Sequence, residues 1–160
     1  MIRFYIEGLA VSLAVLIPNI LFLAFPPHDI PGREKAGAGM RALEIPERLG
    51  QLGFTVIPAF TGIPFKGALG ITAAAGMLAA LILYYCGWLR YYTRGRDFSL
   101  LFSPMAGIPL PMAIGPVLYL AFYAAGARSL LMGAAAVIFA AGHLSVSYKT
   151  YRELLKIQTK

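Results

Sequence analysis

The segment ALGITAAAGMLAALILYYCGWL, residues 68–89, is apolar throughout and carries no charged side chain. A helix needs about 20 mostly apolar residues to cross a bilayer, so this segment predicts a membrane span. The whole chain has the same character, with 59% hydrophobic and 13% charged residues. Ordinary soluble domains are about 25% charged, and one of this size cannot bury so much apolar surface. We therefore expect one domain, an all-α polytopic membrane protein.

Four further apolar segments bring the expected number of transmembrane helices to five. They are residues 4–25, 49–65, 99–125 and 129–148. The second and fourth spans contain several prolines, which remove helix hydrogen bonds and clash with the preceding turn. We expect these two spans to be kinked or broken. The polar stretch 26–48 is expected to be a cytoplasmic loop, and residues 149–160 a basic C-terminal tail.

Lysine and arginine are distributed unequally between the two sides that five spans define. The side that holds the C-terminus carries eleven of the fourteen, and the opposite side carries three. Because cytoplasmic loops are enriched in these residues, the N-terminus is predicted outside and the C-terminus in the cytoplasm. The protein would then lie in the cytoplasmic (inner) membrane of a bacterial cell. The formal net charge of +7 favours contact with anionic membrane lipids over nucleic acid.

The fourth span contains SPMAGIPLPMAIGPVLY, residues 103–119, with four prolines in an apolar run. Irregular backbone at membrane depth is tolerated only where it is buried in protein or lines a cavity. We therefore predict an interior span that bends near Pro109 and Pro111 and turns its freed carbonyls towards a pocket. Pro58 and Pro64 of the second span are the expected counterpart, which places the pocket between spans two and four.

Polar groups at membrane depth are costly and are therefore candidate functional residues. Most of them fall in the expected cytoplasmic half. The candidate ligand-binding set is Asn19, Glu47, Arg48, Gln51, Pro109, Pro111 and His143. Structural alternatives exist: Asn19 can bond the carbonyl that Pro18 frees, and Glu47 after Pro46 suits the first turn of a helix. In the outer half, Glu7 is expected to pair with Arg3, or else to face the bundle interior.

Spans three and five contain small residues at helical spacing, in segments 72–80 and 133–142. Such residues let helix backbones approach closely. Packing within the chain is favoured, and a homodimer seam is the alternative. The tripeptide GIP occurs at 62–64 and 107–109, which hints at a duplication of spans two and three as four and five, although chance similarity is the preferred interpretation.

No sequence motif indicates catalysis, a metal site or a cofactor, and Cys86 is the single cysteine. The leading hypothesis is a protein that binds or translocates a small solute or lipid in a cytoplasm-facing pocket. One alternative is a membrane-embedded enzyme acting on a lipid or isoprenoid, with His143 or Glu47 as acid or base. The other is a non-catalytic membrane subunit that docks a partner through its small-residue faces.

Overall fold

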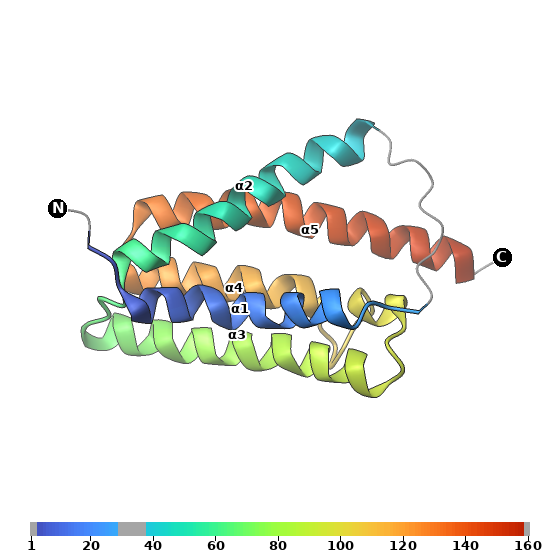
Figure 1. Ribbon diagram of the computed structural model, residues 1–160, viewed down its shortest axis with the longest axis horizontal. Helices are drawn as coiled ribbons and strands as arrows, with labels where there is room; N and C mark the ends of the chain where they lie inside the picture. Colours follow the sequence, from blue (N-terminus) through green and yellow to red (C-terminus); the bar gives the residue numbers. More distant parts are fainter. Residues whose placement is uncertain (1–2, 29–37, 159–160) are drawn as a thin grey trace.

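The computed structural model describes residues 3–28 and 38–158, and this part of the chain forms five α-helices and one 3-10 helix. They are α1 (Ile6–Ala24), α2 (Ala38–Thr61), α3 (Gly67–Thr93), η1 (Phe98–Leu101), α4 (Pro111–Ala127) and α5 (Leu130–Gln158). The α-helices run alternately up and down, with the two termini at opposite ends (Figure 1). Helix α2 packs along α5, and α3 packs along α4. Helix α1 lies against α2 and α3.

Three of these helices, α1, α3 and α5, are long and apolar enough to cross a membrane. Helix α4 is apolar but shorter. The outer surface of the bundle is also apolar: Ile71, Leu78 and Val137 are 74%, 60% and 69% exposed. Soluble monomers rarely expose large contiguous apolar patches. The all-helical fold and its apolar exterior therefore indicate a membrane protein.

The fourth expected span, 99–125, is not one helix. The chain forms η1, then an irregular segment, and α4 begins only at Pro111. Ala106 and Gly107 have φ of 52° and 76°, and the Met105 and Ile108 backbones exchange two hydrogen bonds across them. Positive φ at both central residues is typical of a tight type I′ turn. Pro111 occupies the first turn of α4, where its missing N–H costs nothing. The predicted bend near Pro111 is thus a helix start.

Three carbonyls of η1 and the irregular segment accept hydrogen bonds from one side chain. Arg90, in the last turn of α3, donates to the carbonyls of Leu100, Ser103 and Pro104 at 2.7, 2.9 and 2.8 Å. The planar guanidinium presents five N–H donors in a fixed fork, which suits several acceptors at once. Arg90 therefore holds this non-helical backbone against α3. These three carbonyls point towards the Arg90 guanidinium.

Helices α2 and α5 extend further than the sequence predicted. Helix α2 begins at Ala38, so its N-terminal part lies within the expected loop 26–48, and Pro46 lies inside the helix. The expected capping role of Glu47 in a first turn is therefore wrong. Residues 29–37 of the expected loop, and 159–160 of the expected tail, lie outside the described residues. Helix α5 continues through the rest of that tail.

Tyrosine hydroxyls attach α1 to its neighbours. The hydroxyls that donate to α1 or the residue after it belong to Tyr84, Tyr85, Tyr91, Tyr92 and Tyr119. Pro18 has no N–H to give to the Ala14 carbonyl, and the Tyr85 hydroxyl donates to that carbonyl at 2.9 Å. Asn19 was expected in this role, but its amide donates to the Val15 carbonyl instead, at 3.0 Å.

Two other expectations concern packing. The guanidinium of Arg3 lies over the Tyr5 ring, 5.9 Å from its centroid, and within the described part of the chain it forms no ion pair with Glu7.

Small residues of spans three and five do line helix contacts inside the chain: a Cβ on Gly76 would lie 2.6 Å from the Phe122 ring. Ala75 and Ala79, by contrast, face outward, so a homodimer seam stays an untested prediction.

Candidate functional site

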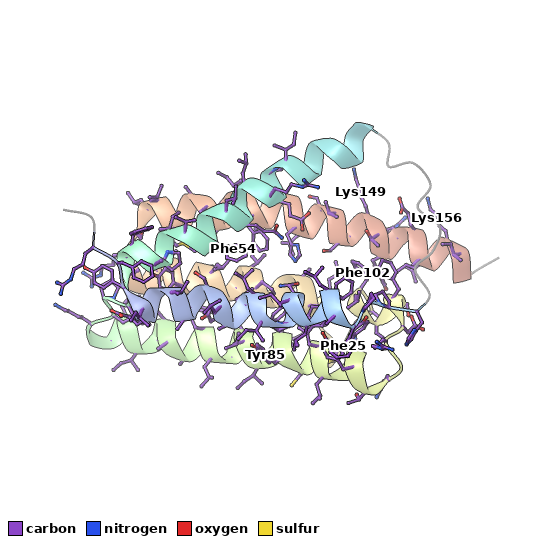
Figure 2. All side chains as sticks on the ribbon, in the orientation of Figure 1. Phe25, Phe54, Tyr85, Phe102, Lys149 and Lys156 are labelled. Carbon is purple, nitrogen blue, oxygen red and sulfur yellow. The ribbon has the colours of Figure 1, made fainter. Side chains whose placement is uncertain are left out.

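A cavity of about 700 Å³ lies between the helices, is partly open to the surface, and is lined by all five α-helices. The segment at and after η1 adds Leu101 and Phe102. Figure 2 labels Phe54 and Phe102, two of the lining aromatic residues. Asn19 and Trp88 each lie about one turn before the end of their helices. The cavity therefore extends into the half of the bundle that lies nearer the C-terminus.

The walls of the cavity are mostly aromatic and aliphatic. The aromatic lining residues are Phe22, Phe54, Tyr84, Trp88, Phe102 and Phe139. Phe54 of α2 and Phe139 of α5 meet edge to face, with ring centroids 5.1 Å apart. Such walls can enclose an apolar chain or ring, and ligand sites typically combine them with a few polar groups.

The principal polar feature is a carboxylate–imidazole pair between α2 and α5. His143 Nδ1 and Glu47 Oε1 are 2.6 Å apart, and the two side chains are 22% and 18% exposed. The His143 ring also stacks on Phe139, with centroids 4.7 Å apart and an interplanar angle of 15°. Because Nδ1 bonds the carboxylate and one ring face is covered by Phe139, Nε2 is the imidazole atom left for a ligand.

A glycine allows the two helices to meet at this pair. A Cβ added to Gly142 would lie 2.4 Å from the Glu47 backbone nitrogen. Real Cβ atoms essentially never approach that closely. Gly142 therefore sets the distance between α2 and α5 next to His143, which explains why the Glu47 carboxylate can reach the imidazole.

A second polar group enters the cavity from α1 and α3. The Asn19 amide donates to the Tyr84 hydroxyl at 3.0 Å, and both residues line the cavity. Trp88, one turn further along α3, also lines it and is 6% exposed. Its indole nitrogen is buried, and its ring meets that of Tyr84 edge to face with centroids 6.1 Å apart. Trp88 was missed by the sequence reasoning, although it is the only tryptophan of the chain.

The structure brings together most of the predicted ligand-binding residues. Asn19, Arg48, Gln51 and His143 all line the cavity. Glu47 joins them through its bond to His143. Whether they bind a ligand stays a prediction.

The two predicted prolines lie elsewhere. Pro109 is exposed and Pro111 is buried in the first turn of α4, and neither lines the cavity, whereas Pro116 does. Helix α2 packs on α5 and α1, and α4 packs on α3 and α5. The cavity is lined by residues of α2 and α4, and also by residues of α1, α3 and α5.

Positive charge surrounds the end of the bundle nearest the cavity. Lys149 and Lys156 lie on the last part of α5, at the same end of the bundle as Phe102 (Figure 2). Arg94 and Arg152 are exposed there as well. Arg48 lines the cavity itself and already has an interaction partner in the protein. The arrangement favours a ligand whose polar end is neutral or negative.

No family model, no curated protein sequence and no solved structure matches this chain.

Proposed function

We propose that this protein binds an amphipathic, lipid-like ligand in the cavity, with the polar end of the ligand near Glu47 and His143. The observation that carries the proposal is the combination of an aromatic-walled cavity of about 700 Å³ with this hydrogen-bonded pair. An apolar ligand would leave the pair without a role, and a small polar solute would leave the aromatic walls unfilled. A molecule with a polar head and an apolar chain uses both.

The same proposal includes the sidedness of the protein. Five membrane crossings by α1 to α5 put the basic end of the bundle in the cytoplasm, in accordance with the positive-inside rule. The cavity extends into that half of the bundle, so its ligand would be taken from, or released to, the cytoplasmic leaflet or the cytoplasm. Helix α4 is short for a span, and the segment of residues 98–110, held by Arg90, would complete its passage.

Filling the cavity tests the proposal directly. Ala113 lines the cavity and is 4% exposed, so Ala113→Phe should occupy part of the space. Ala121 is on the same helix and faces outward, so Ala121→Phe adds the same side chain outside the cavity. Native mass spectrometry of the purified proteins should find a co-purified lipid on the wild type and on Ala121→Phe, and little on Ala113→Phe. Equal lipid retention by all three would contradict the proposal.

The polar pair can be tested separately. His143→Ala removes the imidazole, and Glu47→Gln keeps the shape of the side chain but removes its charge. Both should weaken ligand retention without unfolding the protein. Glu153→Gln, at an exposed position of α5, is the matched control and should behave as the wild type. Unchanged retention in both pair variants, with folding intact, would remove His143 and Glu47 from the site.

The Glu47–His143 bond also favours a second candidate function, catalysis on a lipid or isoprenoid substrate. A carboxylate bonded to Nδ1 fixes the tautomer of an imidazole and supports general acid–base chemistry at Nε2. Turnover of a component of a membrane lipid extract by the purified protein, abolished in Glu47→Gln, would establish this activity. A ligand that is bound but returned unaltered after prolonged incubation favours binding or translocation.

A further inference from the structure

Several hydrogen-bond donors that line the cavity are already used within the protein. The Asn19 amide donates to the Val15 carbonyl and to the Tyr84 hydroxyl, each at 3.0 Å. The Tyr84 hydroxyl in turn donates to the Val15 carbonyl at 3.3 Å. The Thr55 hydroxyl, also in the lining, donates to the Gln51 carbonyl at 2.7 Å. These three side chains keep oxygen lone pairs that can accept a further bond, but they have no hydrogen left to donate.

The imidazole of His143 presents a further acceptor to the cavity. Because the Glu47 carboxylate can only accept a hydrogen bond, the proton of the neutral ring lies on Nδ1. The other ring nitrogen, Nε2, then carries a lone pair, and no described residue forms a hydrogen bond to it. A ligand group that bonds Nε2 must therefore bring a hydrogen of its own.

Ser147 lies one turn after His143 on α5 and is a second polar group on the same wall. It is 5% exposed and lines the cavity. Serine and threonine in helices often donate to the carbonyl four residues back, as Thr150 does to Val146 at 3.0 Å. Ser147 makes no such bond, nor any other to the described residues. Because a buried hydroxyl without a partner is costly, a polar group of the ligand is expected beside it.

We infer that the ligand is a lipid alcohol, whose uncharged hydroxyl head donates to His143 Nε2 and has Ser147 as its second polar contact. This inference rests on the proposed function and specifies the chemical class of the ligand. A hydroxyl both donates and accepts, so it suits a free acceptor and a free hydroxyl together. A fully ionised head has no hydrogen to donate, and it would meet the Nε2 lone pair with the Glu47 charge behind it. An ammonium head could donate, but Arg48 lines the cavity and exposed lysines and arginines surround this end of the bundle.

Four probes with one apolar chain separate these heads: farnesol, farnesyl methyl ether, farnesyl phosphate and farnesylamine. Each is titrated calorimetrically into the full chain in detergent micelles, with protein-free micelles as the blank. The methyl ether keeps the chain and the oxygen of farnesol but has no hydrogen to donate. A site that bonds a hydroxyl rejects an analogue without one, so farnesol should bind at least about tenfold more tightly than the ether. It should also bind more tightly than the phosphate and the amine.

The four affinities separate this inference from the proposed function. Equal binding of farnesol and its methyl ether would overturn the hydroxyl donor and leave the amphiphile site intact. Tighter binding of the phosphate or of the amine than of farnesol would overturn the uncharged head. If no probe binds while a co-purified lipid still depends on the cavity, the lipid-alcohol inference fails alone. If no lipid is retained either, the proposed function fails with it.

Two variants test the side chains that hold the head. Ser147→Ala should weaken farnesol binding about fivefold, whereas Ser145→Ala, on the same helix but outside the cavity lining, should leave it unchanged. Combining Glu47→Gln with His143→Phe removes Nε2 without leaving an unpaired carboxylate, and keeps a ring next to Phe139. This double variant should bind farnesol and its methyl ether within about threefold of each other. Wild-type affinity for farnesol in Ser147→Ala, or a wild-type preference for farnesol in the folded double variant, would overturn the inference.

Discussion

Replacing Gly142 with alanine should push α2 away from α5 at the Glu47–His143 pair. The new Cβ would lie 2.4 Å from the Glu47 nitrogen and 2.8 Å from its Cα, where ordinary contacts begin at 3.4 Å. The backbones must therefore separate by about 1 Å in a close-packed contact. Overpacking of this kind costs about 1–3 kcal/mol. Alanine favours the helix over glycine by about 1 kcal/mol, which offsets part of that cost.

Gly133 provides the matched control, because it lies on the same helix and nothing lies within 4 Å of its added Cβ. Gly133→Ala gains the helix propensity without the collision. The two variants should therefore differ by about 1–3 kcal/mol in the free energy of unfolding, with Gly142→Ala the less stable. Denaturant unfolding in detergent, followed by far-UV circular dichroism, measures this difference. Gly142→Ala should also retain less co-purified lipid, because Glu47 no longer reaches His143.

Equal stability of Gly142→Ala and Gly133→Ala would refute the reasoning. It would mean that α2 and α5 are not in close contact at this point, and the carboxylate–imidazole pair would lose its structural basis.

Three further predictions concern the helices that frame the cavity. Arg90→Ala should expose the segment of residues 98–110 to limited proteolysis, because three backbone carbonyls lose their donor, whereas Arg94→Ala should leave the cleavage pattern unchanged. Tyr85→Phe should lower the free energy of unfolding by about 1–2 kcal/mol. In a Pro18→Ala background the loss should be smaller, because residue 18 then has an N–H that can bond the Ala14 carbonyl. A double-mutant cycle measures this coupling between positions 18 and 85. Trp88 emission should lie at short wavelength and resist iodide quenching; quenching as strong as for free tryptophan would place the indole in water.

The sequence alone determined the class of fold. A chain in which 59% of the residues are hydrophobic and 13% are charged has few alternatives to a helical membrane protein, because helices satisfy their own backbone groups in lipid. The three long apolar helices were therefore predictable from composition and length. The polar residues around the cavity were also predictable as a set, since polar groups within apolar segments are rare enough in such a chain to be conspicuous.

The tertiary structure decided which residues meet. Prolines in the segment 103–119 predicted a bent helix whose carbonyls face a pocket. In the structure, Ala106 and Gly107 have positive φ values and belong to a turn outside any helix. Arg90 donates hydrogen bonds to the carbonyls of Leu100, Ser103 and Pro104. Local sequence cannot show this, because the donor comes from another helix. The same holds for Pro18, whose lost bond is replaced by Tyr85 from α3.

The Glu47–His143 pair likewise depends in part on the sequence and in part on the tertiary structure. Each residue was a candidate because of its chemistry, but they are 96 positions apart in the chain. They meet because α2 crosses α5 at Gly142, which has no side chain to keep the backbones apart. The sequence determined which polar groups fall within apolar segments. Only helix packing decided that a carboxylate–imidazole pair and a set of aromatic side chains would meet at one cavity.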